Sequence, residues 1–571
     1  MRFAALATDY DGTLAKKGLV ESRTIEALRK LRRTGRRVIL VTGRTLASLR
    51  EVFPCLGEFD SIVAENGGTL YNPATSSERL LTSAPPEALV TLLRKRTRLT
   101  IEIGHVIIAT SQLEKQIVLD AIQELGLELN IIFNKGSLMI LPSGVNKATG
   151  LAVALKALGL SVHNIAGIGD AENDHAFLAA CEFSAAVANA LPTVRDRVQL
   201  VTAQGFGRGV VELVDEMIGN DLARHRGRLG QPILIGHDRD GRDIAVAACS
   251  FKVVCGPSGS GKSTFTTSLL ERLFTAGYQF CAIDAEGDYE QFPDAVVCGN
   301  ANHVPTIAEI VKALNTPSQN VIVNLLGLEY EKRPAMFQTL FTHLQDLRNK
   351  TGRPHCLILD EAHHFVQGGL ESSVPYLEAF FSDPASGLTL ITVNPDRLPA
   401  GPLAKTHLVV IAGDEPLRTL QAFCSHAALP CPDGEPVRLH EKEILGWYPA
   451  GGQPFAFSSL STEVERVRHR RKYAEGELAP DRSFYFRGPA GKLNLRAYNL
   501  ITFLNMMNGV DDETWLFHLQ NGDYSTWFRK EIKDEELAQL TTTLENTPHL
   551  TAAETRAKLH QIVAERYTFP Q

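Results

Sequence analysis

The feature that most constrains the fold is a short apolar segment that runs directly into a pair of aspartates. Residues 3–8 have the length and composition of a buried strand, and Asp9-Tyr10-Asp11-Gly12-Thr13 follows at once. A basic amphipathic helix is predicted over 22–33, and a second apolar strand, 38–41, ends in Thr42-Gly43-Arg44. Strand, helix and strand in this order predict a doubly wound parallel sheet. Ligands of such sheets bind at the carboxyl ends of the strands, where these polar residues fall.

A third apolar strand is predicted over 164–168, after a helix over 148–158 that Asn146-Lys147 opens. This strand also ends in carboxylates, in the run Gly169-Asp170-Ala171-Glu172-Asn173-Asp174. The pattern therefore places Asp9, Asp11 and Thr42 at the carboxyl ends of strands of the first sheet, and the third strand also ends in carboxylates.

These four motifs, in this order, resemble those of the haloacid dehalogenase superfamily. Glu65-Asn66-Gly67-Gly68 and Asn189-Ala190 resemble its Cof-type, subfamily IIB branch, which includes sugar-phosphate and phosphoglycolate phosphatases. The resemblance covers about residues 1–218, and it implies an α/β phosphatase domain for a small phosphorylated substrate.

The resemblance also implies a role for each motif residue. Asp9 would be the nucleophile, because an aspartyl-phosphate divides phosphoryl transfer into two easier steps. Asp11 would protonate the leaving oxygen and later activate water. Thr42 would hydrogen-bond a phosphoryl oxygen, and Lys147 would neutralise its charge. Mg2+ is a hard cation that prefers oxygen, and its predicted ligands are the carboxylates of Asp9, Asp11, Asp170 and Asp174.

An insert at about 70–142 separates these motifs. Its pattern predicts, in order, helix 85–96, strand 99–110, helix 111–125 and strands 128–134 and 137–142. In the family this position carries an α+β cap that closes over the substrate and excludes water. The basic run Arg94, Lys95, Arg96 and Arg98 either binds an anionic substrate or forms a solvated helix face, and the sequence favours the second.

A second domain is predicted over 230–460, after a polar and basic linker at 219–229. The apolar strand 251–255 leads into the phosphate-binding motif Gly-x4-Gly-Lys-Ser, in which glycines let backbone N–H groups surround phosphates at a helix N-terminus. Lys262 would reach the β- and γ-phosphates, and Ser263 would ligate Mg2+. The predicted nucleotide-binding residues are Gly256, Ser258, Gly259, Ser260, Gly261, Lys262, Ser263, Thr264 and Asp360.

A partner carboxylate pair follows another apolar strand, 356–359. Asp360 would hold Mg2+ in this second site, and Glu361 would polarise the attacking water. A further strand, 388–393, ends in Asn394, which either senses the γ-phosphate or forms a turn with the following proline.

The strand 282–284, followed by Ala-Glu-Gly-Asp-Tyr at 285–289, resembles the RecA-like ATPases of the HerA and FtsK translocase group. Oligomeric members of that group use an arginine from a neighbouring subunit, for which Arg397 and Arg418 are the candidates. The resemblance thus implies ATP as a ligand and a homo-oligomer formed through this domain.

A small, mostly α domain is predicted over 481–571, after a linker at 461–480. Four helices are predicted here, 493–507, 512–520, 525–532 and 533–545, with a short strand at 483–486. Trp515, Phe517, Trp527 and Phe528 are interpreted as core rather than as a ligand site.

Composition narrows the class of protein further. The 571 residues are 44% hydrophobic and 22% charged, which is typical of folded domains, and no apolar run is long enough to cross a membrane. Nine scattered cysteines favour reduced thiols and a cytoplasmic location. The net charge of −7 gives no support to nucleic-acid binding, and the basic run at 466–472 is interpreted as a solvated helix face.

The sequence therefore predicts a bifunctional chain with an Mg2+-dependent phosphatase and a P-loop ATPase. Three alternatives remain. The chain is a nucleic-acid translocase with an auxiliary phosphatase domain, a small-molecule kinase paired with a phosphatase, or a regulatory protein in which ATP gates the cap.

Overall fold

The computed structural model describes residues 2–228, 232–257, 260–366, 386–432, 437–440, 443–462, 483–489, 491–532 and 534–566. The chain folds into two compact units, Met1–Leu460 and Ser461–Gln571. Over the described ranges, no helix combines the length and apolarity that a membrane crossing needs. The basic run at 466–472 and most of the predicted linker 461–480 lie outside the described residues.

An eight-stranded sheet organises the first part of unit 1, in the order β12-β11-β10-β1-β2-β3-β4-β5. The strands are β1 Ala5–Thr8, β2 Arg37–Val41, β3 Ser61–Ala64, β4 Thr69–Asn72, β5 Ser77–Leu80, β10 Ile165–Gly169, β11 Phe183–Ala186 and β12 Leu200–Val201. Strands β12 to β3 are parallel, and β4 and β5 add an antiparallel hairpin. Every residue of β1, β3, β10 and β11 is buried, as expected where helices cover both faces of a parallel sheet.

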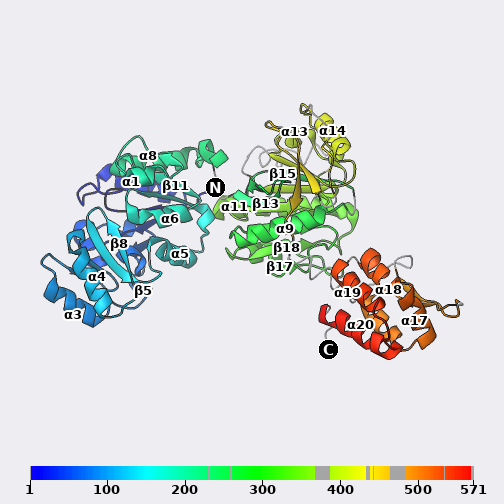
Figure 1. The fold of residues 1–571 in the computed structure, drawn as a ribbon. Coiled ribbons are helices and arrows are strands. Elements are labelled where there is room, and N and C mark those ends of the chain that lie inside the picture. Colours follow the sequence, from blue (N-terminus) through cyan, green and yellow to red (C-terminus); the bar gives the residue numbers. More distant parts are fainter. Residues whose placement is uncertain are drawn as a thin grey trace. The chain divides into compact units, whose positions relative to one another are not determined.

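Helices pack on both faces of this sheet (Figure 1). They are α1 Ser22–Arg33, α2 Leu46–Val52, α5 Lys147–Leu158, α6 His175–Ala180, α7 Pro192–Arg195 and α8 Phe206–Asn220. Helix α1 has the predicted bounds, because Ala27, Leu28 and Leu31 bury one stripe of it. The predicted linker is partly folded: Leu222 is buried, and the Asp221 carboxylate accepts hydrogen bonds from Arg2 N (2.5 Å) and Arg36 Nη2 (2.9 Å).

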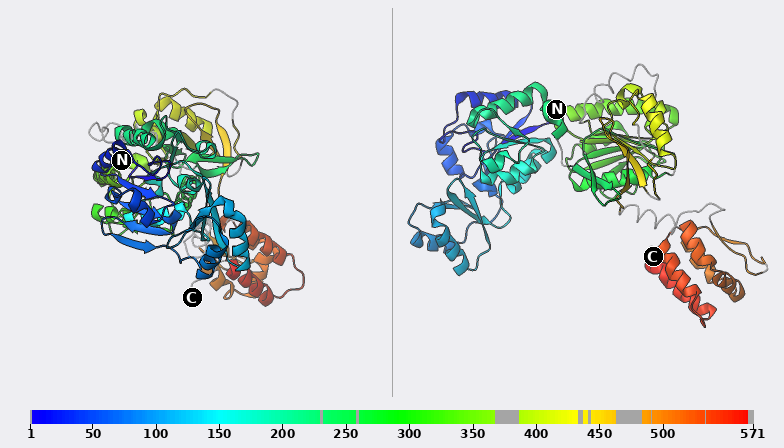
Figure 2. Two further views of the ribbon diagram at one scale, coloured as in Figure 1. Left: turned by 90° about the vertical axis from the view of Figure 1, so that its left-hand side faces the viewer. Right: turned by 45° about the horizontal axis from the view of Figure 1, so that its top comes forward.

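The insert forms a separate lobe, hereafter the cap, which the right-hand view of Figure 2 shows below the first sheet. It comprises α3 Glu87–Arg96, β6 Glu102–Ile103, β7 Ile108–Ser111, α4 Lys115–Glu124, β8 Leu129–Asn134 and β9 Ser137–Pro142. Its sheet is antiparallel in the order β6-β7-β9-β8. The cap begins later than predicted, because β4 and β5 extend the main sheet. The predicted strand 99–110 is interrupted, because the amides of residues 105–107 donate to the Glu65 carboxylate instead of a strand.

An eleven-stranded sheet organises the second part of unit 1, in the order β14-β13-β23-β22-β21-β15-β20-β19-β16-β18-β17. The strands are β13 Pro232–His237, β14 Asp243–Ala247, β15 Lys252–Cys255, β16 Phe280–Asp284, β17 Ala295–Cys298, β18 Asn320–Asn324, β19 Cys356–Leu359, β20 Leu388–Thr392, β21 Leu408–Ile411, β22 Glu443–Trp447 and β23 Phe455–Ser459. The helices with described bounds are α9 Lys262–Thr275, α10 Ile307–Leu314, α11 Arg333–Thr351, α13 Ala400–Leu403 and α14 Pro416–His426. The seven strands from β21 to β17 in this order are parallel, and the other four, β14, β13, β23 and β22, are antiparallel.

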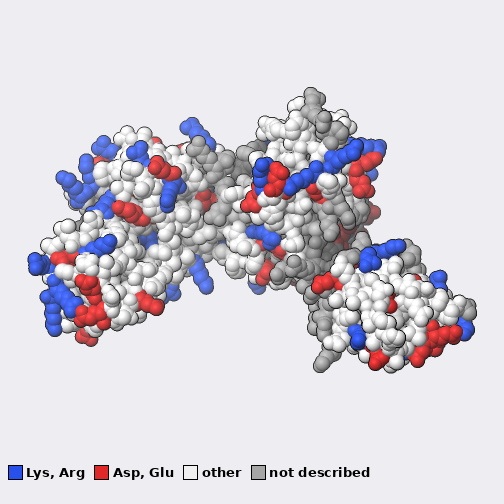
Figure 3. Space-filling model, in the orientation of Figure 1, with Lys and Arg blue, Asp and Glu red and all other residues white. Residues whose placement is uncertain are grey.

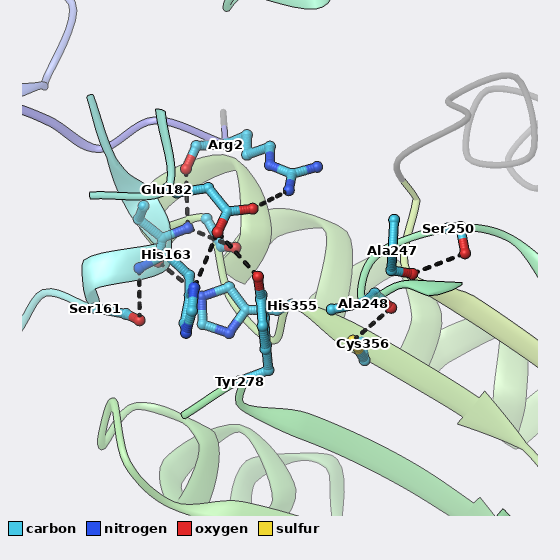
Figure 4. Close-up of polar contacts among 12 residues, drawn as sticks. Arg2, Ser161, His163, Glu182, Ala247, Ala248, Ser250, Tyr278, His355 and Cys356 are labelled. Atoms are coloured by element: carbon cyan, nitrogen blue, oxygen red, sulfur yellow. Dashed lines mark hydrogen bonds and ion pairs between the residues drawn. The ribbon is translucent and has the colours of Figure 1, made fainter. Parts of the chain in front are cut away.

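The two sheets of unit 1 meet through buried polar side chains at the amino ends of their strands (Figure 4). The His163 ring stacks on Tyr278, with centroids 3.6 Å apart, and Tyr278 Oη donates to Glu182 Oε2 at 3.0 Å. Asn164 Nδ2 donates to Gly352 O (3.1 Å), and its Oδ1 lies 3.1 Å from His355 Nε2. No sequence pattern indicated this contact, because each residue alone looks like an ordinary loop residue before a strand.

Unit 2 is built around aromatic residues. It contains β24 Phe484–Phe486, β25 Leu495–Ala497, α16 Leu500–Met507, α17 Asp512–Gln520, α18 Asp523–Trp527, the π-helix η10 Phe528–Ile532, α19 Glu535–Glu545 and α20 Ala552–Arg566. Trp515, Trp527 and Phe528 are buried in its core. The helix predicted over 493–507 begins only at Leu500, because Asn499 caps α16 and residues 495–497 pair with β24.

Candidate functional site

Three carboxylates gather at the carboxyl edge of the first sheet. Asp9 follows β1, and Asp170 and Asp174 follow β10, its neighbour in the sheet. One oxygen from each lies within 4.8 Å of the others, and all three residues are buried. This is the only group of three or more His, Cys, Asp or Glu side chains within ligand distance among the residues that the structure describes. Its oxygen donors suit a hard divalent cation.

Lys147, the first residue of α5, reaches into this acidic group. Its Nζ lies 2.5 Å from Asp9 Oδ1 and 2.6 Å from Asp174 Oδ1. Burial alone would lower the pKa of Lys147, but the carboxylates of Asp174 and Asp9 outweigh it and raise that pKa. Burial also raises the pKa of Asp9 well above its usual range, although Lys147 opposes the change. Lys147 thus pairs with two of the three buried carboxylates, while burial keeps the pKa of Asp9 raised.

Backbone geometry explains how the acidic residues come so close. Gly12 has a φ of 90°, and a Cβ there would lie 2.2 Å from the Asp170 carboxylate, so only glycine fits. Asp174 Oδ2 accepts from the backbone N–H groups of Asp170 (2.8 Å) and Ala171 (3.0 Å), which fixes the loop after β10. Thr13 Oγ1 donates to Asp170 Oδ1 at 2.9 Å.

Asp11 lies outside the acidic group, in contrast to its prediction as a metal ligand. Its side chain is 42% exposed and forms a bidentate pair with Arg44, with distances of 2.5 and 2.9 Å. Asp9 and Asp11 follow the end of a strand, where the side chains of residues two apart need not point the same way. Thr42 is buried after β2, and its Oγ1 accepts from Arg44 N at 3.1 Å. Arg44 thus links Asp11 to Thr42, a role that the sequence alone did not reveal.

Two more charged residues join the cap to this edge. Glu65 is fully buried after β3 and accepts hydrogen bonds from the backbone of His105, Val106 and Ile107 in the cap. Lys135, at the turn between β8 and β9, bonds through its Nζ to the Asp170 carboxylate. Sequence reasoning named Glu65 only as part of a motif and missed Lys135, because nothing near Lys135 in the chain marks it as functional.

The phosphate-binding motif of the second sheet has the expected position between β15 and α9. Gly256 has a φ of 147°, and a Cβ there would lie 2.0 Å from the carbonyl oxygen of Ala412. Gly261 also has positive φ, at 101°, and Ser260 and Thr264 lie beside it in the same turn and helix start. Lys262 Nζ donates to Pro257 O at 2.9 Å, inside its own loop. Ser258 and Gly259 lie outside the described residues.

Acidic side chains approach this loop from β16 and β19, which β20 separates from β15 in the sheet. Ser263 Oγ donates to Asp288 Oδ2 at 2.6 Å, and Asp288 follows β16. Asp360 is buried at the end of β19, and burial, with Asp284 and Glu361 nearby, raises its pKa well above the usual range. Asp288 was not among the predicted site residues, although its place after a predicted strand was a usable signal.

Glu361 has left-handed backbone (φ 46°), and its Oε2 lies 3.3 Å from His363 Nδ1. Burial lowers the pKa of His363 to about 4, so this ring is neutral at pH 7. Asn394 follows β20, which lies between β15 and β19, and its N–H donates to Thr392 Oγ1 at 3.0 Å. Arg397 is exposed, and Arg418 pairs with Glu415 at 3.0 Å on the surface.

Comparison with known proteins defines the class of each domain. The family model described as haloacid dehalogenase-like hydrolase matches residues 6–103 and 92–214, and an AAA domain model matches residues 246–394. The chain belongs to the haloacid dehalogenase-like hydrolase family through its first domain. It is an enzyme with a phosphatase domain, followed by an AAA-type ATPase domain.

Individual relatives match the first domain over nearly their full length. The chain is 30% identical over 220 residues to the phosphoglycolate phosphatase of Methanothermobacter thermautotrophicus, covering 38% of this chain and 99% of the relative. It is 31% identical over 225 residues to that of Methanothrix thermoacetophila, covering 37% and 96%. A solved structure from Thermoplasma acidophilum is similar at 19% identity and a TM-score of 0.34, covering 38% of this chain and 99% of that one.

Proposed function

We propose that the first domain hydrolyses a small anionic phosphomonoester, of which 2-phosphoglycolate is the leading candidate, through a phosphorylated Asp9. The observation that supports this most directly is the buried group of Asp9, Asp170 and Asp174 around Lys147. A phosphate dianion needs a nucleophile, positive charge and exclusion of water in one place, and this edge of the sheet brings the three together.

The residues of this edge divide the chemistry among them. One Asp9 oxygen is held by Lys147, so the carboxylate is oriented toward the space above the strand ends. Lys147 would balance charge on the phosphoryl oxygens, and the Thr42 hydroxyl would donate to one of them. Asp11 would give a proton to the leaving oxygen and then take one from water once it is released from its bidentate pair with Arg44, since that pair occupies both of its oxygens.

The same carboxylates fit Mg2+. Asp9, Asp170 and Asp174 offer three buried oxygens within 4.8 Å of one another, the kind of donor that Mg2+ prefers. When bound, Mg2+ would neutralise the repulsion between Asp9 and an anionic phosphate.

The cap supports a small substrate. It bonds to the core through Lys135 and Asp170, and a Cβ placed on Gly43 would lie 2.9 Å from Met139 Cε of β9. A cap that approaches the strand ends this closely leaves room for a leaving group of a few atoms. The named relatives, both phosphoglycolate phosphatases, favour that substrate over a sugar phosphate.

Substitution of Asp9 tests this proposal. Asp9→Asn keeps the size and removes the nucleophile, so release of phosphate from phosphoglycolate should fall by about 10³-fold or more. Lys262→Ala, in the other domain, should leave that rate unchanged and serves as the matched control. Undiminished turnover by Asp9→Asn would rule out the aspartyl-phosphate.

For the second domain we propose binding and hydrolysis of ATP with Mg2+, in which Lys262 binds phosphate, Ser263 and Asp360 hold the metal ion, and Glu361 orients water.

Surface charge gives no support to nucleic acid as a partner. On the face shown in Figure 3, one short row of Lys and Arg side chains crosses the domain of the second sheet, with Asp and Glu at its ends, and elsewhere the two signs are interspersed. ATP hydrolysis that DNA stimulates, with a steep salt dependence, would instead favour the HerA- and FtsK-like alternative.

A further inference from the structure

The cap places one cation directly at the phosphatase site. Strands β8 and β9 are joined by the two residues Lys135 and Gly136, with φ values of 47° and 90°. Positive φ at both positions is the geometry of a type I′ hairpin turn, which gives the tip a fixed direction. Lys135 N lies 3.4 Å from Glu172 Oε2, so the tip also rests on the loop after β10.

The Lys135 ammonium extends from this tip to the acidic group. It bonds to Asp170 Oδ2, and a Cβ on Gly12 would lie 2.5 Å from its Nζ. It therefore lies beside the loop that carries Asp9. In contrast, Arg94 and Lys95 are exposed on α3, which Figure 1 draws at the outer end of the cap. The basic run on α3 is thus a solvated face rather than a substrate contact.

Lys135 differs from Lys147 in what holds it. Lys147 is 1% exposed and fixed between two carboxylates, whereas the Lys135 side chain is 40% exposed and shares a single carboxylate. A divalent cation held by Asp170 would share the charge of that carboxylate and so weaken its hold on the Lys135 ammonium. Its four-carbon stem allows it to turn toward a second anion on the cap side of the site.

We propose that Lys135 is a specificity-determining residue that binds the carboxylate of a short phosphorylated hydroxy acid. The proposal rests on the proposed phosphatase function and deepens it. The phosphoryl group would lie at Asp9 and Lys147, and the acid end of the leaving group would face the hairpin tip. A neutral leaving group of the same size would leave the Lys135 ammonium unpaired in the closed site, which disfavours it.

The test compares 2-phosphoglycolate with ethyl phosphate, which has the same length and lacks the acid. The wild-type protein should prefer phosphoglycolate. Lys135→Met keeps most of the stem and removes the charge, so KM for phosphoglycolate should rise about 10- to 100-fold, while KM for ethyl phosphate should change less than about threefold. Lys135→Arg should recover most of the loss, and Lys95→Met, on the outer helix of the same cap, should change neither KM.

A binding measurement separates this role from a merely structural one. In the Asp9→Asn background with Mg2+, calorimetry should show that Lys135→Met weakens phosphoglycolate about 10- to 100-fold and inorganic phosphate less than about threefold. Equal loss for both ligands would overturn the proposal, since Lys135 would then serve the phosphoryl or metal site. No loss for either, or no preference of the wild type for the acid, would also overturn it.

Failure of the proposed function gives a different result. If the wild type releases no phosphate from either ester, the phosphatase proposal fails. Calorimetry of phosphoglycolate and inorganic phosphate, with and without Lys135→Met, still decides whether Lys135 recognises the acid.

Discussion

Glu182→Gln is the substitution expected to loosen the contact between the two sheets of unit 1. The Glu182 carboxylate is buried and receives Arg2 Nη2 at 2.6 Å, His163 Nδ1 at 2.9 Å and Tyr278 Oη at 3.0 Å (Figure 4). Burial alone would raise the pKa of Glu182, but the hydrogen bonds and charges of His163 and Arg2 outweigh it and lower that pKa. The carboxylate is therefore ionised and acts as the acceptor for donors from both sheets.

Glutamine keeps the shape but replaces one acceptor oxygen with an NH2 group that faces donors. Tyr278 Oη is the donor to Glu182 that belongs to the second sheet, whereas Arg2 and His163 belong to the same sheet as Glu182 and stay paired with it when the contact opens. A hydrogen bond to a charged group contributes about 1.5–3 kcal/mol, and we expect about 2 kcal/mol here. An energy of this size corresponds to an opening constant about 30-fold larger.

Hydrogen–deuterium exchange is the appropriate assay, because it reports the opening of this contact separately from global unfolding. Protection of the Tyr278 and His355 amides should fall about 30-fold in Glu182→Gln, where exchange follows the opening equilibrium. Tyr278→Phe should lose a similar amount, since it removes the same bond between the sheets. Glu26→Gln, in the exposed pair with Arg33, is the control and should change nothing. A fall of less than about fivefold in Glu182→Gln would refute the reasoning.

Three further outcomes follow from the structure. Burial lowers the pKa of His355 well below its usual range, so the stabilising contribution of the neutral ring is complete above the unfolded pKa of about 6.5. As pH falls below that value, the free energy of unfolding should decrease by up to about 1.4 kcal/mol per pH unit. Urea titrations should show a flatter dependence on pH for His355→Asn, which keeps an acceptor for Gln279 N. Glu361→Gln should slow ATP hydrolysis by about 100-fold while filter binding shows unchanged ATP affinity, and loss of binding would assign Glu361 to the nucleotide instead. Asp288→Ala removes the partner of Ser263. Mg2+ titrations of ATPase activity should then show a higher Mg2+ requirement, while the ATP affinity measured without Mg2+ stays unchanged. An unaltered Mg2+ requirement would contradict a role for Asp288.

The strand ends were the part of the fold most open to prediction. Strands β1, β2 and β10 are apolar on both faces and end in polar residues, and this pattern alone located Asp9, Thr42 and Asp170. The cap was less predictable. Its hairpins are short, and the break at residues 104–107 depends on Glu65, a buried acceptor far earlier in the chain whose effect has no local signal.

Side-chain direction limited the prediction of the site itself. Asp11 and Asp9 share a motif, yet Arg44 draws Asp11 away from the acidic group. Lys135 reaches its site from a hairpin distant in sequence, so no spacing rule could find it. Such contacts are fixed by how the cap and the strands are packed, which periodicity alone does not determine.

The orientation of the two sheets decides how the two activities could communicate. Arg2, Asn164 and Glu182 precede strands of the first sheet, and Tyr278 and His355 precede strands of the second. Both proposed phosphate sites lie at the carboxyl ends of strands, whereas the contact of Glu182 with Tyr278 lies at the amino ends. Coupling of the two proposed activities through this contact would take the form of a change in the packing of the two sheets. Glu182→Gln should then abolish any effect of ATP on the phosphatase rate while each separate activity persists, and an ATP effect that survives this substitution would place the coupling elsewhere.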